Sequence, residues 1–277
     1  MFIYIDSLED LRYLNRELLG KEYLGVDTEF RRTRKDNMKL GLLQINDSEE
    51  IYLIDTILIN EPQENCSFLF SDSVIKILHS CKEDIEAVYS WTGRTMENIY
   101  DTQIADSFLN GEFSISYQGL VEKVLGIKVD KGETRSNWLR RPLRDSQLNY
   151  AASDVEFLIE LFKNQNKSLI QEDKNNWMDQ EIKSLSSKMS SEFYDDQDVP
   201  SKLTKSEERI LLSKFNDIVI NLAEKHKVNH TFLFSKKGQK NFLRLALKEG
   251  LDEALSDITN WRSDIFREPL TNMLKII

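Results

Sequence analysis

Hydrophobic and polar positions alternate differently in successive parts of the chain, and each pattern predicts a different element. Residues 23–30, YLGVDTEF, are rich in β-forming side chains, which predicts a strand. Side chains two residues apart on a strand point the same way, so Asp27 and Glu29 are predicted to share one face. The sequence therefore places two carboxylates, which repel each other, on one face of an apolar strand.

A helical spacing of apolar residues covers residues 148–162, within the segment LRDSQLNYAASDVEFLIELF. Asp145 or Ser146 is a suitable N-cap for this helix. Tyr150 and Asp154 are four residues apart, so the helix would carry both side chains on one side.

A third pattern lies in VIKILHSCKEDIEAVYSW, where a short apolar run is followed by a helical one. We expect a buried strand over residues 74–78 and a helix that opens near Lys82. Asp84 then falls in the first turn of that helix, close to the sheet end where α/β sites collect. For His79 we expect a structural hydrogen-bonding role and not metal binding, because Mg²⁺ prefers oxygen ligands.

Beyond residue 204 the chain shows helical spacing without strand patterns. The first such helix begins at a capping box, with Thr204 as N-cap and Glu207 three residues later. We expect three parts: residues 1–185 as an α/β domain with a trailing helix, residues 186–204 as a linker, and residues 205–277 as a small helical domain. The helices expected in the last part cover residues 210–224, 239–248, 251–255 and 270–277.

The acidic residues in these patterns indicate metal chemistry. Each pattern alone has an ordinary explanation: a solvated strand face, charge in a first helical turn, or a helical Tyr–Asp pair. However, Asp27 follows an apolar run that contains no lysine or arginine, and a buried carboxylate needs a partner. Several carboxylates that converge from separate elements are suited to hold the divalent ions of a two-metal phosphodiesterase. The pattern as a whole favours a nuclease.

Four segments resemble the ribonuclease D family, within the DEDD superfamily of 3′→5′ exonucleases. They are GVDTEFRRTRKDNMKLGLLQIND, ILHSCKEDIEAV, YDTQIADSFL and DKGETRSNWLRRPLRDSQLNYAASDVEFLIEL, and the resemblance covers roughly residues 1 to 165. It implies a ribonuclease H-like α/β domain with a mixed sheet. Tyr150 corresponds to the tyrosine branch of the superfamily, whereas the histidine branch would place its base at the position of Asn149.

The resemblance also implies roles for the five site residues. Asp27, Glu29 and Asp154 would hold one Mg²⁺ or Mn²⁺ ion, with Asp27 bridging to a second ion. Asp84 would act on the second ion through water, and Tyr150 would orient the attacking water. The implied product is a nucleoside 5′-monophosphate released from a free 3′ end.

The segment TNWRSDIFREPL resembles the closing helices of a helicase-and-RNase-D C-terminal (HRDC) domain, present here once where well-known family members carry two. The implied substrates are the 3′ ends of transfer RNA (tRNA) precursors and other small structured RNAs. A DNA or short-oligonucleotide exonuclease stays an alternative. A non-catalytic RNA or protein adapter is a further alternative, against which the intact set of five site residues argues.

Several residues outside this set are candidates for substrate contact, each with an ordinary structural explanation beside it. Phe30 could stack on a terminal base or belong to the core. An arginine-rich run precedes the Tyr150 helix and could contact phosphates or form a solvated loop. A basic cluster in the last part could do the same. The run comprises Arg135, Arg140, Arg141 and Arg144, and the cluster comprises Lys236, Lys237, Lys240 and Arg244.

Charge and composition refine these expectations. The net charge of the 277 residues is −10, yet residues 201–277 hold 14 Lys and Arg against 10 Asp and Glu. The acidic excess therefore lies in the expected catalytic part. Cys66 and Cys81 stand in no C-x-x-C arrangement, which argues against a disulfide framework and a zinc site. No signal peptide or membrane span is predicted, so we expect a cytoplasmic protein.

Overall fold

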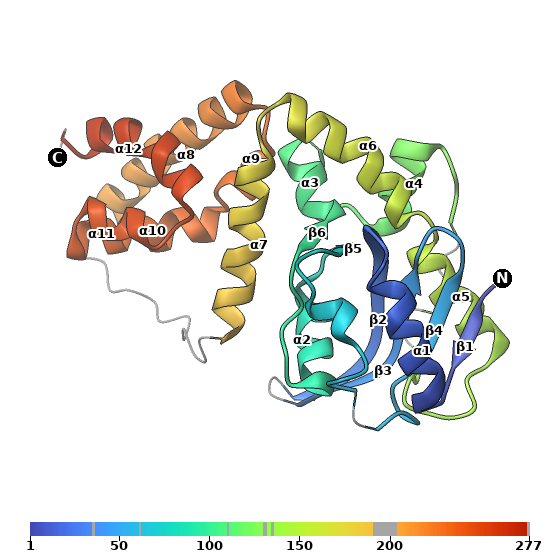
Figure 1. Cartoon of the computed structure of the whole chain (residues 1–277). Coiled ribbons are helices and arrows are strands. Elements are labelled where there is room, and N and C mark those ends of the chain that lie inside the picture. The colour runs from blue at the N-terminus through green and yellow to red at the C-terminus, as the bar shows by residue number, and fades with distance from the viewer. Residues whose placement is uncertain are drawn as a thin grey trace. The chain divides into compact units, whose positions relative to one another are not determined.

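The computed structural model of the chain describes residues 1–34, 37–60, 62–109, 111–129, 132–133, 136–190 and 204–275. The chain divides into two compact units (Figure 1). The first unit comprises Met1–Ala105 and Ser114–Ser168, and the second comprises Asp106–Phe113 and Leu169–Ile277.

A six-stranded mixed sheet forms the centre of the first unit, in the strand order β1-β4-β3-β2-β5-β6. β3 pairs antiparallel with β2 and β4, whereas the β1–β4, β2–β5 and β5–β6 pairs are parallel. This arrangement confirms the predicted mixed-sheet α/β class. The strands are β1 (Ile3–Ile5), β2 (Tyr23–Arg34), β3 (Asn37–Asn46), β4 (Ile51–Asp55), β5 (Ile75–Leu78) and β6 (Ile99–Asp101).

Helices cover both faces of β2. Thr28 and Arg32 on this strand bond to residues of α2, whereas Gly25 lies against the end of α5. Even and odd positions of β2 therefore face different helices, as the two-residue period of a strand requires. The helices that begin in this unit are α1 (Leu8–Leu18), η1 (Ser67–Phe70), α2 (Lys82–Thr92), α3 (Thr102–Phe108), α4 (Tyr117–Leu125), α5 (Asp145–Glu156) and α6 (Leu158–Gln171).

The helix predicted over residues 148–162 is interrupted. α5 ends at Glu156, and α6 starts at Leu158. The Phe157 N–H between them donates to the Tyr117 hydroxyl at 3.0 Å, a contact with α4 that local spacing could not reveal. The expected N-cap was also wrong. Arg144 holds that position, and its backbone N–H donates to the Gln147 side chain.

The second unit is helical in its described part. Its helices are α7 (Asn175–Ser190), α8 (Lys205–His226), α9 (His230–Leu233), α10 (Lys236–Glu249), α11 (Leu251–Ser256) and α12 (Asn260–Leu274). The predicted capping box opens α8, because the Thr204 side chain accepts from Glu207 N and the Glu207 carboxylate accepts from Thr204 N. Instead of a separate helix over residues 270–277, α12 runs continuously through Pro269.

The division into units differs from the boundary expected at residue 185. α7 belongs to the helical unit because its side chains contact α12. Trp177 stacks on Trp261 with ring centroids 4.6 Å apart, and Glu181 pairs with Arg262. The first five residues of the expected linker, 186–190, continue α7, and residues 191–203 lie outside the described residues.

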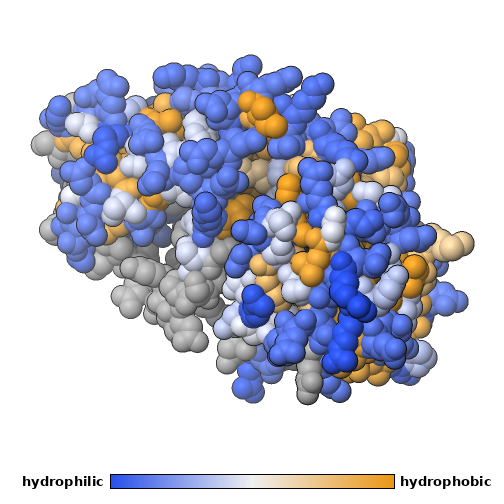
Figure 2. All heavy atoms as spheres, viewed as in Figure 1, coloured by the Kyte–Doolittle hydropathy of each residue, from blue (hydrophilic) through white to orange (hydrophobic). Residues whose placement is uncertain are grey.

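Hydrophilic residues predominate on the molecular face drawn in Figure 2, with smaller apolar areas among them. No helix within the described ranges combines the length and apolar character needed to span a bilayer. Cys66 and Cys81 are both buried free thiols.

Candidate active site

β2 positions Asp27 and Glu29 on the face that α5 covers. The register of β2 against β3 is regular from Gly25 to Glu29. A Cβ atom at Gly25 would lie 3.2 Å from the Val155 carbonyl oxygen, so the glycine lets the end of α5 approach the strand closely. Asp27 and Glu29, at the following odd positions, continue this face toward the same helix.

α5 supplies Tyr150 and Asp154 one helical turn apart. Asn46 at the end of β3 fixes the C-terminal end of α5 by donating to the Val155 and Glu156 carbonyls, both at 3.0 Å. Tyr117 adds a second anchor, since its hydroxyl donates to the Ser153 carbonyl at 3.1 Å. These bonds hold the helix against the strand that carries the other carboxylates.

Three carboxylates converge where β2 meets α5. Asp27, Glu29 and Asp154 each offer an oxygen atom, and these atoms lie within 4.8 Å of one another. Asp154 Oδ1 is buried and finds no hydrogen-bond partner among the described residues. The three acids come from the two elements in which the sequence predicted them.

A cavity of about 130 Å³ opens beside this cluster. Two of the three carboxylates and the Tyr150 side chain line it, so a small polar ligand could reach them together. The lining residues are Asp27, His79, Tyr117, Gln118, Tyr150, Asp154 and Leu158.

Asp84 lies near the cluster but is held separately. It occupies the first turn of α2, as predicted, and it is 6% exposed. The Thr28 hydroxyl donates to Asp84 Oδ1 at 2.5 Å, which ties α2 to the strand between Asp27 and Glu29. Asp84 is also an electrostatic neighbour of Asp27, because its charge raises the pKa of that carboxyl.

The pKa values of all four acids are raised, and for Asp27 and Glu29 repulsion by the other acids of the site adds to the effect of burial. Burial is the largest cause in each case, followed for Asp27 by the charges of Asp84, Asp154 and Glu29. The pKa of Glu29 rises to about 9, that of Asp84 to about 7 and that of Asp154 to about 6. Clustered acids with raised pKa values are typical of sites that bind a cation.

The donor set fits divalent metal ions. Carboxylate oxygens are hard ligands, and such ions would neutralise charges that burial otherwise disfavours. The unpartnered Asp154 oxygen supplies a free ligand position. Asp27, Glu29 and Asp154 are the residues able to hold one ion directly.

Tyr150 stays protonated in this setting. Burial, followed by the charge of Asp154, raises the pKa of its phenol far above the ordinary value. Its ring packs against the buried Trp138, with ring centroids 6.2 Å apart. The hydroxyl is thus a neutral hydrogen-bond donor beside the carboxylates.

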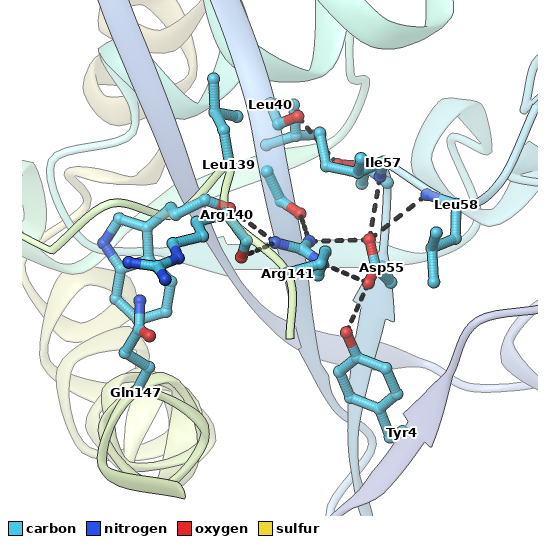
Figure 3. Close-up of polar contacts among 12 residues, drawn as sticks. Tyr4, Leu40, Asp55, Ile57, Leu58, Leu139, Arg140, Arg141 and Gln147 are labelled. Carbon is cyan, nitrogen blue, oxygen red and sulfur yellow. Dashed lines mark hydrogen bonds and ion pairs between the residues drawn. The ribbon is translucent and has the colours of Figure 1, made fainter. Parts of the chain in front are cut away.

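Arg141 does not match its predicted role as a phosphate contact. Its guanidinium donates to both oxygens of the buried Asp55 and to the carbonyls of Gly41, Trp138 and Arg140 (Figure 3). These bonds use all five N–H donors of the side chain. Arg141 is therefore a structural residue whose partner lies 86 positions away in the sequence.

The neighbouring candidates differ in their surroundings. Arg140 is exposed, and Arg144 is exposed and pairs with Glu133 at 2.6 Å. Phe30 is half-buried on β2, opposite Leu40. These three stay predictions, and Arg135 lies outside the described residues.

In the basic cluster of the helical unit, Arg244 does not match its predicted role as a nucleic-acid contact. Arg244 pairs with Glu208 of α8 at 2.6 Å, and both side chains are largely buried, so Arg244 joins α10 to α8. Lys236 and Lys237 are exposed in the first turn of α10, and Lys240 is half-buried one turn later. These lysines stay candidates for nucleic-acid contact.

Sequence reasoning missed two residues of the site. Thr28 binds Asp84, and its place between Asp27 and Glu29 was the available signal. Gln118 lines the cavity and lowers the pKa of Asp154 by hydrogen bonding, but no local pattern marks it. The structural role expected for His79 agrees with its bonds to Thr102 Oγ1 and the Ile115 carbonyl, both at 2.9 Å.

Comparison with known proteins identifies the family. A family model described as 3'-5' exonuclease matches residues 2–170. The chain belongs to this family. Ribonuclease D of Shewanella sp. (strain ANA-3) is 36% identical over 181 residues, which cover 65% of this chain and 47% of that protein. The predicted resemblance to ribonuclease D is confirmed. The matched region covers about half the length of this curated relative, and a smaller share of two other ribonuclease D proteins.

Solved structures share the fold. Escherichia coli RNase D, described as an exoribonuclease involved in structured RNA processing, aligns with a TM-score of 0.68 at 24% identity and covers 99% of this chain and 75% of its own. Trypanosoma brucei RNase D in complex with RNA U12 aligns with a TM-score of 0.52 at 21% identity, over 58% of this chain and 61% of its own. Both likenesses support the ribonuclease H-like architecture.

Proposed function

We propose that this protein is a metal-dependent 3′→5′ exoribonuclease that releases nucleoside 5′-monophosphates. The observation that carries the proposal is the convergence of Asp27, Glu29 and Asp154 within 4.8 Å, half-buried and with raised pKa values. A charge cluster of this kind is costly to keep in a fold unless it serves a cation. Because the chain belongs to the 3'-5' exonuclease family, we infer that the cation supports hydrolysis of a phosphodiester bond.

Each acid has a distinct task in this proposal. Asp27, Glu29 and Asp154 would hold one Mg²⁺ or Mn²⁺ ion, and Asp27 together with Asp84 would serve a second. The bound ions would lower the pKa of the attacking water and stabilise charge on the scissile phosphate. Thr28 keeps the Asp84 carboxylate turned toward the strand through its 2.5 Å hydrogen bond.

Tyr150 orients the attacking water as a neutral donor. Burial and the charge of Asp154 raise the pKa of its phenol, which favours a hydrogen-bond donor over a general base. Its ring packs against Trp138 and its hydroxyl hydrogen-bonds to Asp154, which directs the hydroxyl toward the carboxylates.

The substrate that we propose is the free 3′ end of RNA, including tRNA precursors and other small structured RNAs. Support comes from the curated relatives named ribonuclease D and from the RNA bound to the Trypanosoma brucei protein. The helical unit, with its exposed Lys236 and Lys237, would add contacts to longer RNA.

The test uses matched RNA and DNA strands of one sequence, labelled at the 5′ end and incubated with Mg²⁺ or Mn²⁺. We expect a ladder of RNA that shortens from the 3′ end, with nucleoside 5′-monophosphates as the released product. A 3′-phosphorylated RNA should resist, because the additional charge would occupy the place of the terminal ribose. Preferred digestion of the DNA strand would favour the DNA-exonuclease alternative, and cleavage of circular RNA would refute an exonuclease.

A further inference from the structure

The hairpin formed by β2 and β3 continues beyond the active site as a two-stranded ribbon. Past Glu29 the β2 strand carries Arg31, Arg32 and Arg34, and β3 carries Lys39. Arg31 lies directly opposite Lys39 in the register of the ribbon. The ribbon is therefore strongly basic, although residues 1–200 carry a net excess of acidic side chains.

Arg31 lies on the same face of β2 as the carboxylates. The register passes from Glu29 opposite Leu42 to Phe30 opposite Leu40, so the extra residue of this bulge is Gly41 on β3. β2 itself is uninterrupted from Asp27 to Arg31. Strand alternation then places Asp27, Glu29 and Arg31 on one face, with Arg31 about 7 Å beyond Glu29.

The opposite face of the ribbon is closed by α2. Thr28 bonds Asp84, and Arg32 pairs with Glu86 and, at 3.6 Å, with Glu83. The charge of Arg32 is therefore neutralised by carboxylates. Arg32 serves as an internal contrast to Arg31, its immediate neighbour.

Arg31 and Lys39 show no such compensation. Both side chains are exposed, and neither has an ion-pair partner within the described residues. Like charges directly opposite each other in an antiparallel pair destabilise the ribbon. Arg31 and Lys39 thus place two positive charges next to the carboxylate site, at the position two residues beyond Glu29. A polynucleotide whose 3′ end lies at the carboxylates has its next phosphates upstream, and these cations would attract them.

We propose that Arg31 and Lys39 bind the phosphate backbone of single-stranded RNA immediately upstream of the 3′ end held at Asp27, Glu29 and Asp154. This proposal rests on the proposed exoribonuclease function. It assigns the ribbon, and not only the helical unit, to substrate engagement. The ribbon then contributes to the affinity for strands longer than a few nucleotides and leaves the reacting phosphate to the carboxylates.

The test measures equilibrium binding of a 5′-fluorescent single-stranded RNA with a free 3′ hydroxyl, by anisotropy over a range of salt concentrations. The 277-residue chain carries Asp154→Asn in every sample, so that the probe is not consumed. The ribbon pair is the double variant Arg31→Gln/Lys39→Gln, and the control pair is the double variant Arg16→Gln/Lys167→Gln. The second pair removes the same charge from exposed positions on α1 and α6.

We expect the ribbon pair to bind RNA more weakly and to reduce the slope of log K against log salt by roughly 1.4, about 0.7 for each phosphate contact to a single strand. The control pair should have the same slope, within error, as the chain with Asp154→Asn alone. Arg31→Lys keeps the positive charge and should also leave the slope unchanged. The unfolding temperature of the ribbon pair should be unchanged or raised, because a repulsion is removed.

An unchanged slope for the ribbon pair, with RNA bound normally by the parent, would overturn this inference and leave the proposed function intact. A slope reduced equally by the control pair would also overturn it, since the effect would then be one of net charge. Failure of the Asp154→Asn parent to bind RNA at all, together with failure of the wild-type chain to bind it in EDTA, would overturn both proposals.

Discussion

Arg141 donates two hydrogen bonds to Asp55, a carboxylate that is fully buried at the end of β4 (Figure 3). Asp55 also accepts from the Tyr4 hydroxyl and from the backbone N–H groups of Ile57 and Leu58. Burial raises the pKa of Asp55, but these bonds outweigh it and the pKa lies below the ordinary value. The pair joins β4 to the segment that leads into α5 and Tyr150.

Replacing Arg141 should therefore destabilise the fold and not simply weaken substrate binding. Arg141→Met leaves Asp55 buried without its cation, for which we expect a loss of about 3 to 5 kcal/mol in the free energy of unfolding. Chemical denaturation measures this loss. Arg140→Met, at the exposed neighbouring position, is the matched control and should change stability by less than about 0.5 kcal/mol. Equal stability of the two variants would contradict the structural role of Arg141.

The stability of the metal-free protein should fall as pH rises. The raised pKa values of Glu29, Asp84 and Asp154 mean that the folded state holds protons that the unfolded state releases. Stability is therefore lost from about pH 4, where unfolded carboxyls ionise, up to about pH 9, the pKa of Glu29. Thermal unfolding in EDTA across this window tests the trend. A flat profile would contradict the crowding of charge at the site.

Asp154→Asn should separate stability from activity. In EDTA near pH 8 the substitution removes the charge of a half-buried carboxylate whose pKa is raised, so we expect the free energy of unfolding to rise by about 2 kcal/mol. Added Mg²⁺ or Mn²⁺ should stabilise the wild type and have little effect on the variant. Lower stability of the variant in EDTA would contradict the raised pKa, because the hydrogen bonds to Asp154 would then outweigh the cost of its charge.

Metal binding should release protons near neutral pH. Glu29 is protonated there because its pKa is about 9, and a bound divalent ion requires the carboxylate. Calorimetric titration with Mn²⁺ in buffers of different ionisation enthalpy measures the number of protons released. We expect release that declines toward about pH 9, and heats independent of the buffer at pH 7 would be incompatible with the raised pKa.

Tyr150→Phe should be milder than the loss of a carboxylate. The phenylalanine ring keeps the contact with Trp138 and loses only the hydroxyl that orients water. We expect the rate to fall by about 10²-fold or less, with the fold and metal affinity unchanged. A Tyr150→Phe enzyme as inactive as Asp154→Asn would mean that the hydroxyl does more than position water.

Local periodicity predicted the elements that carry the site. Asp27 and Glu29 share a face because of strand alternation, and Tyr150 and Asp154 lie one helical turn apart. Both relationships are fixed within a few residues. The sequence could therefore indicate which acids converge, once the family resemblance set their order along the chain.

Relationships between distant residues could not be predicted in this way. The arginine-rich run before α5 was predicted to contact phosphates, yet Arg141 forms an ion pair with Asp55, 86 residues earlier in the sequence. Arg244 likewise belongs to Glu208 on another helix. An arginine has the same appearance in a sequence whether its partner is a buried carboxylate or a substrate, and only the packed structure distinguishes the two cases.

The most direct test of the account is the hydrolysis of 5′-labelled RNA while Mg²⁺ is titrated into wild-type protein and the Asp154→Asn variant. We predict that the wild type shortens the RNA from its 3′ end only when metal is present, and that EDTA stops the reaction. The variant should be inactive, or at least several orders of magnitude slower, at every metal concentration. Shortening of the RNA by the wild type in EDTA, or by Asp154→Asn at the wild-type rate, would contradict the claim that these carboxylates form a catalytic metal site.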